Sequence, residues 1–454
     1  MFACTLYPAD DAFLDNVKQE AQYNIQRLRN HPCIALWCGN NEVDMAIKNW
    51  DWPEKFGYSE AQFEQLKSDY LRLFDVCLRE AVEEYDPQRF YLRSSPIGSW
   101  EEDEDHIGNH HYWGVWHGEE PFSEYQKRIP RFMSEFGFQS FPMMSSLQQF
   151  TLDQDLALES EVMKTHQKHP RGNSLIQQYF EREYHAPKDF VNLVYLSQVQ
   201  QALGLKLAFE AHRKAMPFCM GTLYWQLNDT WPAASWSGID YYGKWKALHY
   251  QAKRSFAQQL LVIEQDEHNT TVQLVSDSLL AFDAELKLSL IGFDGESHWS
   301  HTCDVSVLAN TSQQVFCIAN SEILAQVDVS KIVLTAQLVS EGTYTPLCEA
   351  LFYYVPSQQL MLCNAQLEIT YHLSGNTLQL RLLTNQLMRQ VYLEIPNVKG
   401  NFSDNFMDVL PGQAKTVELQ LTNEECENVT VLLEQLSWIS LYDSYTQTTD
   451  RSIN

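Results

Sequence analysis

The periodicity of apolar residues changes once along this chain, near Gln265, and this change most constrains its fold. Before that point, short apolar runs alternate with longer stretches whose apolar residues recur every three or four positions. After it, short alternating or apolar runs follow one another, many of them separated by turn residues. The first pattern is typical of parallel strands covered by helices, and the second of antiparallel β-sandwiches. The sequence therefore predicts an α/β part followed by an all-β part.

The α/β part is predicted to contain six strand ends. The stretch from Asp10 to Asn30 illustrates its helices, because Phe13, Val17 and Ala21 form one apolar stripe and acidic residues open the stretch. Further helices are expected at Ser59–Tyr85, Asn173–Tyr184, Lys188–Lys214 and Lys244–Leu261. Strands are expected at Cys4–Tyr7, Ile34–Trp37, Phe90–Arg93, Asn109–Tyr112, Arg131–Ser134 and Gly221–Leu227.

The all-β part divides near Pro356–Cys363 into two pieces of about 90 residues, which is about the size of one immunoglobulin-like sandwich. We therefore expect domains at 1–262, 263–357 and 358–454. Strands are expected at Thr271–Val275, Ala284–Leu290, Ile332–Leu338, Ala350–Tyr354, Leu378–Leu382, Val391–Ile395 and Val429–Leu433.

The charge balance restricts the kinds of partner. The formal net charge is −27, so nucleic acid and anionic membranes would repel the chain. No apolar run approaches the ~18 residues of a membrane-spanning helix. The ten cysteines lack zinc-type spacing, and we interpret most of them as buried apolar side chains. The acidic run at Glu101–Asp105 is expected to be a solvated loop rather than a cation site.

Two strand-like segments end in a carboxylate. Ile34-Ala35-Leu36-Trp37-Cys38-Gly39-Asn40-Asn41-Glu42 leads to Glu42, and Arg131-Phe132-Met133-Ser134-Glu135-Phe136 leads to Glu135. In α/β barrels, catalytic groups lie just beyond the carboxyl ends of strands. Glycoside hydrolysis uses two such carboxyl groups, although a single glutamate at a strand end is more often a solvated loop residue.

A third segment ends in polar and aromatic residues. Gly221-Thr222-Leu223-Tyr224-Trp225-Gln226-Leu227-Asn228-Asp229-Thr230-Trp231-Pro232 places indole rings beside amides, which suits a sugar-binding pocket. Tryptophans packed in the core at a domain joint would give the same pattern, so this segment alone does not decide between the two.

Together the three segments resemble the retaining β-glycosidases that combine β-sandwich domains with a (β/α)8 barrel. This is the family that holds β-galactosidase and β-glucuronidase, and the β-mannosidases are the members most similar to this sequence. Trp37-x-Gly39-Asn40-Asn41-Glu42 is similar to the acid/base motif, and Ser134-Glu135-Phe136-Gly137-Phe138-Gln139-Ser140 to the nucleophile motif. Tyr224-Trp225-Gln226-Leu227-Asn228-Asp229-x-Trp231-Pro232 is similar to the last barrel strand.

The resemblance implies an exo-β-mannosidase that releases terminal β-D-mannose from oligosaccharides or glycoconjugates by double displacement, without a metal or cofactor. Glu42 would be the acid/base and Glu135 the nucleophile. A raised pKa of Glu42 would be needed in the first step. The implied substrate contacts are Asn41 at the sugar 2-hydroxyl, Trp225 as a platform, Trp50 at the rim, and Tyr112, which would orient Glu135. Asn228 and Asp229 are further pocket candidates.

The sequence departs from this family at its start. It opens at what resembles the third barrel strand, so residues 1–262 would supply about strands 3 to 8. Two strands would then be missing, and a parallel barrel with two open edges is costly. We therefore expect a partial barrel with impaired activity.

Several alternatives stay open. Another exo-β-glycosidase of the same clan, such as exo-β-glucosaminidase or β-galactosidase, would share the two glutamates. A non-catalytic carbohydrate-binding fragment would keep the sandwiches and the aromatic pocket. A homodimer and the compartment are left open; a cytoplasmic location is favoured, and any targeting signal would lie in the missing region.

Overall fold

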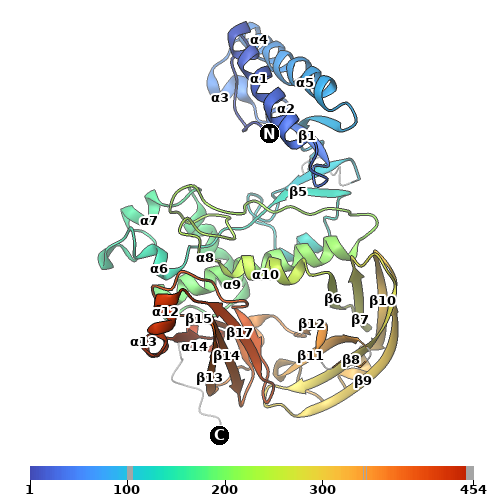
Figure 1. Ribbon diagram of the computed structural model, residues 1–454, viewed down its shortest axis with the longest axis vertical. Helices are drawn as coiled ribbons and strands as arrows, with labels where there is room; N and C mark the ends of the chain where they lie inside the picture. Colours follow the sequence, from blue (N-terminus) through green and yellow to red (C-terminus); the bar gives the residue numbers. More distant parts are fainter. Residues whose placement is uncertain (100–105, 341, 344, 446–454) are drawn as a thin grey trace. The chain divides into compact units, whose positions relative to one another are not determined.

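The computed structural model describes residues 1–99, 106–340, 342–343 and 345–445 (Figure 1). The acidic run 101–105 lies outside the described residues. Within the described part, no helix is long and apolar enough to cross a membrane. The chain divides into two compact units. Unit 1 comprises Met1–Trp113, Arg128–Phe136 and Phe218–Leu223, and unit 2 comprises Gly114–Lys127, Gly137–Pro217 and Tyr224–Asn454.

The helices of unit 1 form where the apolar stripes predict them. α1 (Asp11–Leu28) begins after Asp10, whose carboxylate accepts a hydrogen bond from the Phe13 amide. α4 (Glu60–Leu71) begins with the expected capping box of Ser59 and Gln62. It continues through the π-helical η1 (Arg72–Cys77) into α5 (Leu78–Tyr85), and α1 packs beside α5 (Figure 1). Val17, Ile25, Leu73, Phe74 and Ala81 belong to the shared core.

Parallel strands make up the rest of unit 1. β1 (Leu36–Asn41) pairs with β2 (Phe90–Ser95), while β3 (Gly98–Ser99), β4 (Asn109–Tyr112) and β5 (Phe132–Phe136) form a second sheet. Single parallel bridges join Phe2 to Asn40 and Thr222 to Met133. Neighbours therefore follow chain order, as in a (β/α) arrangement.

Two predicted strands are wrong in extent. Cys4–Tyr7 and Gly221–Leu227 form no ladder; bridges occur only at Phe2 and, within unit 1, at Thr222. Each segment has a strand of unit 1 on one side only, so few backbone groups are paired there.

Several α-helices of unit 2 come before its sheets in the sequence. They are α6 (Met144–Leu147), α7 (Glu161–Thr165), α8 (Gly172–Glu183), α9 (Phe190–Lys214) and α10 (Ala247–Ser255). The helix predicted over Lys244–Leu261 is wrong at its end, because the chain turns into β6 (Gln259–Gln265). There the apolar run Leu260–Ile263 is fully buried as a strand.

Two antiparallel sandwiches follow (Figure 1). In the first, one sheet has the order β10-β7-β6 and the other β12-β11-β8-β9. The remaining bounds are β7 (Asn269–Ser276), β8 (Phe282–Gly292), β9 (Ser297–Val307), β10 (Thr311–Ala319), β11 (Ile332–Ser340) and β12 (Pro346–Phe352). Alternate residues of β8, from Ala284 to Leu290, face the core, as expected for a sheet with one buried face.

The second sandwich has sheets β13-β14-β17 and β16-β15-β18. Its strands are β13 (Leu367–Ser374), β14 (Thr377–Thr384), β15 (Met388–Glu394), β16 (Met407–Val409), β17 (Lys415–Gln420) and β18 (Ser437–Ile439). The strand predicted at Val429–Leu433 is wrong, because this stretch is the helix α13 (Val429–Glu434). Val429, Leu432, Leu433 and Leu436 pack against the core at helical spacing, which overrides the β-propensity of the valines.

Candidate active site

Glu42 lies at a tight turn between β1 and α2 (Val43–Asn49). Gly39 allows β1 to approach β2, since a Cβ there would lie 2.4 Å from the Arg93 carbonyl oxygen. Buried Asn40 donates to that carbonyl at 3.0 Å and accepts from the Val43 amide at 3.1 Å. Glu42 itself has a φ of 62°, a left-handed conformation that costs a non-glycine residue about 1 kcal/mol. The fold therefore maintains strain where the carboxylate projects.

Glu135 lies in β5, directly opposite His111 of β4. Its carboxylate accepts a hydrogen bond from the Trp113 indole at 3.1 Å. Burial raises the pKa of Glu135 to about 7; the negative charge of Glu42 adds to this effect, whereas His111 and the Trp113 hydrogen bond oppose it. Burial thus penalises the ionised form of the Glu135 carboxyl.

His111 links the two glutamates. Its Nδ1 lies 2.9 Å from Oε1 of Glu42 and 3.8 Å from Oε2 of Glu135. Its Nε2 lies 3.1 Å from the Ser95 hydroxyl, and the imidazole is almost fully buried. The structure therefore brings together the two glutamates that the sequence singled out, with an imidazole between them.

These three residues also form the group of described residues that could hold a metal ion. Their ligand atoms all lie within 4.8 Å of one another. Their hydrogen bonds to each other and to Trp113 account for this proximity, and the sequence resemblance implies hydrolysis without a metal. We therefore describe the group as an acid–base cluster.

Asn41 has the contacts expected of a substrate-binding side chain. Its Nδ2 donates to Oε2 of Glu42 at 3.3 Å. Its Oδ1 is buried and has no hydrogen-bond partner among the described residues. A buried amide oxygen without a partner is costly, so an incoming hydroxyl group would stabilise this site.

Trp50 and Tyr112, two other predicted contacts, are packed into unit 1. Trp50 caps the end of α2 and contacts Trp52 edge-to-face, with ring centroids 6.5 Å apart. Tyr112 is buried in β4. The Trp113 indole donates a hydrogen bond to Glu135, and the orienting role of Tyr112 stays a prediction.

Sequence reasoning missed His111 and Trp113, although a signal for both was present. Side chains alternate along a strand, so residues 109, 111 and 113 share one face and Tyr112 lies on the other. The register of β4 against β5 then aligns His111 with Glu135. Alternation from Asn109 would have favoured His111 and Trp113 over Tyr112.

The remaining predicted residues belong to unit 2 and are described within it. Trp225 and Asn228 are exposed. Asp229 is buried and accepts hydrogen bonds from Lys168 at 2.6 Å, Ser237 at 2.6 Å and Ser235 at 2.7 Å, with Gln226 at 2.9 Å. These contacts hold the Asp229 carboxylate within its loop, and its place in the sugar pocket stays a prediction.

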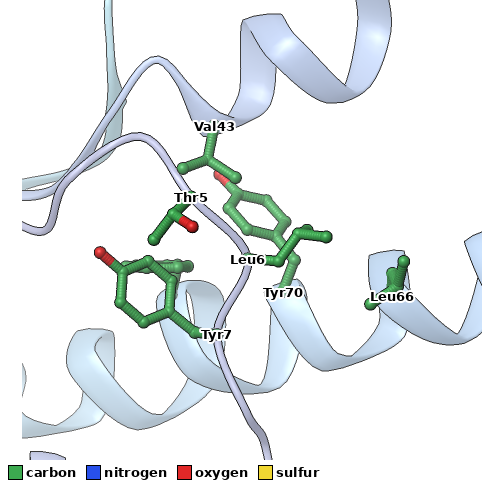
Figure 2. A pocket seen from close by; sticks show the side chains of 7 residues that line it. Thr5, Leu6, Tyr7, Val43, Leu66 and Tyr70 are labelled. Atoms are coloured by element: carbon green, nitrogen blue, oxygen red, sulfur yellow. The ribbon is translucent and has the colours of Figure 1, made fainter. Parts of the chain in front are cut away.

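A small cleft elsewhere in unit 1 carries no comparable chemistry. Figure 2 shows its lining, which is mostly apolar and includes two tyrosines; the lining residues are Thr5, Leu6, Tyr7, Val43, Leu66, Tyr70 and Phe74. The Tyr7 hydroxyl donates to the Ala3 carbonyl, and the Tyr70 hydroxyl accepts from Asn40. With no carboxylate or imidazole in its lining, the cleft is not a candidate for acid–base chemistry.

Comparisons with known protein families match both sandwiches. Residues 268–356 match a mannosidase Ig/CBM-like domain, and residues 362–444 match an Ig-fold domain found in mannosidases. The solved structure of an exo-chitosanase from Amycolatopsis orientalis shares the fold, with a TM-score of 0.63, 14% identity, and coverage of 97% of this chain and 54% of that chain.

More similar proteins carry the name β-mannosidase. The mouse β-mannosidase is 30% identical over 89% of this chain and 49% of its own length. The β-D-mannosidase structure from Dictyoglomus thermophilum is 31% identical, with a TM-score of 0.82 over 97% of this chain and 52% of that chain. The chain thus spans about half the length of the relatives it matches. Over most of its own length the chain is thus similar to proteins named β-mannosidase, and its two sandwiches match domain families of mannosidases.

Proposed function

We propose that this protein acts on β-D-mannosides, releasing a terminal non-reducing mannose with retention of configuration. The observation that carries the proposal is the convergence of Glu42 and Glu135, whose nearest ligand atoms lie within 4.8 Å. Retaining glycosidases place their carboxyl groups ~5–5.5 Å apart, and inverting enzymes ~6.5–9.5 Å apart. The shorter separation supports double displacement.

In the first proposed step, Glu135 attacks the anomeric carbon as Glu42 protonates the departing glycosidic oxygen. The bond from that carbon to the leaving group breaks, and a covalent mannosyl-enzyme forms. In the second step, Glu42 removes a proton from water, and the water oxygen displaces Glu135. The transition state of each step carries positive charge on the sugar ring, which the buried carboxylates stabilise.

Asn41 would bind the sugar 2-hydroxyl through its unpartnered Oδ1. Trp225 would provide the platform, and Trp50 and Asn228 would contribute to the pocket. We further propose that residues 1–262 form part of a (β/α)8 barrel, supported by parallel neighbours in chain order, and that 263–357 and 358–454 are separate sandwich domains.

The test is hydrolysis of p-nitrophenyl β-D-mannoside by the purified chain. Glu135→Gln and Glu42→Gln should each abolish turnover, while the exposed Glu83→Gln should leave it unchanged. Proton NMR of the first-formed sugar should show β-mannose. If the chain alone is inactive, the same assay is repeated with the matching amino-terminal half of a relative added.

Three outcomes would contradict the proposal. Release of α-mannose first would indicate inversion. Faster hydrolysis of the β-galactoside or β-glucosaminide would assign another activity of the same clan. Mannose binding that persists in Glu135→Ala, without hydrolysis under either condition, would indicate a carbohydrate-binding protein.

A further inference from the structure

Buried polar side chains gather near the middle of α9. Four of them are at most 1% exposed, although each carries hydrogen-bonding groups; they are Ser197, Gln198, Gln200 and Gln201. Burying a polar side chain is costly unless it is hydrogen-bonded. The partners of these side chains within unit 2 therefore indicate what this part of α9 holds in place.

Gln201 uses both ends of its side-chain amide. Its Oε1 accepts a hydrogen bond from the Ser140 hydroxyl at 2.7 Å, and its Nε2 donates to the Phe138 carbonyl at 2.7 Å. A longer contact of 3.4 Å joins Nε2 to the Ser237 carbonyl. Turning the amide around would place its oxygen against two carbonyl oxygens, so the network fixes this orientation. Gln201 thus contacts both the segment that follows Glu135 in the sequence and the loop that contains Ser237.

The two segments also meet directly. Ser140 and Ser235 form an antiparallel bridge, with N–H···O distances of 3.0 and 3.1 Å. The Ser197 hydroxyl accepts from the Phe141 amide at 3.1 Å, and the buried Lys246 amine donates to the carbonyls of both bridge residues at 3.3 Å. Side chains of α9 and Lys246 therefore surround one backbone junction between the two segments.

The loop on the other side of this junction carries Trp225. Both backbone groups of the next residue, Gln226, are paired with residues 236–238, through N–H···O contacts of 3.2 and 3.0 Å. This stretch is the one that Gln201 contacts. Trp225 itself is 41% exposed, so its position depends on this backbone pairing more than on burial of its ring.

We propose that Gln201 is a positioning residue, which holds the loop bearing Trp225 against residues 138–141 so that the indole stays in place for a sugar. The inference rests on the proposed function for the role of the Trp225 ring, and on the contacts above for the role of Gln201. Gln200, the preceding residue of α9, donates instead to the Ile176 carbonyl of α8 at 3.1 Å. Gln200 is therefore a matched control, because it is equally buried in the same helix and is bonded elsewhere.

Hydrogen–deuterium exchange of the full chain, followed by mass spectrometry, tests these contacts without any sugar. Gln201→Met is similar in volume and removes the three hydrogen bonds, so exchange in peptides covering 137–143 and 224–238 should rise about tenfold. Gln200→Met should leave both peptides at the wild-type rate. An unchanged rate in Gln201→Met, or an equal rise throughout unit 2, would overturn the proposal.

The indole itself can be observed by 19F NMR after the twelve tryptophans are replaced by fluorotryptophan. The Trp225 signal is identified by its loss in Trp225→Phe. We expect Gln201→Met to shift or broaden this signal, and Gln200→Met to leave it as in wild type. If Gln201→Met does not fold, Ser140→Ala removes the hydroxyl that donates to Oε1 and should act on the same signal and the same two peptides. An unchanged Trp225 signal would count against the proposal.

Calorimetric titration with D-mannose separates this inference from the proposed function. We expect Gln201→Met to weaken binding about tenfold and Gln200→Met to match wild type. Equal affinities for the two variants would leave Gln201 a packing role only, even in a chain that hydrolyses mannosides. If wild type binds no mannose, alone or with the added amino-terminal half, the proposed function fails, and the exchange and fluorine measurements still decide whether Gln201 holds the Trp225 loop.

Discussion

Nδ1 of His111 lies 2.9 Å from Oε1 of Glu42 and 3.8 Å from Oε2 of Glu135, so one imidazole nitrogen faces both carboxylates. The contact with Glu42 is within hydrogen-bonding distance, and the contact with Glu135 is longer. Glu135 is more buried than Glu42 and receives its hydrogen bond from Trp113. Burial makes ionisation of Glu135 costly, and this cost has a measurable effect on the stability of the fold.

Glu135→Gln should stabilise the protein at alkaline pH. Because the folded pKa of Glu135 is raised to about 7, the folded state binds more protons than the unfolded state between about pH 4.5 and pH 7. The contribution of the wild-type carboxyl is fully present below this window and is lost as the pH rises through 7. The variant should therefore match wild type at pH 4 and exceed it by about 2–3 kcal/mol at pH 8.

Urea unfolding at a series of pH values measures this difference. The exposed Glu83→Gln is the matched control, and its stability difference from wild type should not change with pH. A Glu135→Gln variant that is equally or less stable than wild type at pH 8 would show that burial does not penalise this carboxylate.

Gly39→Ala should destabilise unit 1 by about 3 kcal/mol or more, through overpacking against backbone. A Cβ there would lie 2.4 Å from the Arg93 carbonyl oxygen and 2.5 Å from the Tyr91 hydroxyl, and the carbonyl belongs to the paired strand β2. Gly57→Ala is the contrast, because its φ is +67° but nothing lies within 4 Å, and it should cost only ~1–2 kcal/mol. Thermal unfolding of both variants makes the comparison, and equal losses would mean that β1 and β2 separate easily.

Much of the fold could be predicted because hydrophobic periodicity is local. The capping box of α4 and the alternation in β8 can be read from a few neighbouring residues. The prediction fails where partners distant in sequence determine the secondary structure. β6 is a strand because β7 pairs with it, and α13 is a helix because its apolar stripe packs against the second sandwich.

The same distinction explains the site. Glu42 and Glu135 could be predicted from strand-end motifs, since each motif is contiguous. His111 could not be placed beside both from its own segment, because its contact depends on the register of β4 with β5 and on Ser95. Asp229 is a pocket candidate by its position in a motif, whereas its contact with Lys168 joins segments 61 residues apart and cannot be predicted from the motif.

Asp229→Asn should destabilise unit 2 by about 3 kcal/mol, because it leaves the Lys168 ammonium without its buried counter-ion. Neighbouring Asn228→Ala is the control, since Asn228 is exposed and should cost within about 0.5 kcal/mol. Chemical denaturation compares them, and mannose binding should fall in Asn228→Ala alone. A stable Asp229→Asn variant that loses sugar binding would instead support a place for Asp229 in the pocket.

Lys246→Met should change how the stability of unit 2 depends on pH. The Lys246 side chain is fully buried, its Nζ donates to the carbonyls of Ser140 and Ser235 at 3.3 Å, and burial lowers its pKa to about 8. Between pH 8 and the ordinary lysine value, the folded state binds fewer protons than the unfolded state, so wild-type stability gains a contribution as pH rises.

The variant lacks this contribution because methionine carries no charge. Relative to wild type, it should therefore be most favoured at pH 7 and lose about 2–3 kcal/mol of that difference by pH 10. Denaturation curves of both proteins at pH 7, 8, 9 and 10 give this difference in stability. The tyrosines and thiols that titrate in the same range contribute equally to both proteins, so their contribution cancels. The partly exposed Lys67→Met is the matched control. If the stability difference between Lys246→Met and wild type does not change with pH, the Lys246 amine is as well solvated in the folded state as in the unfolded state.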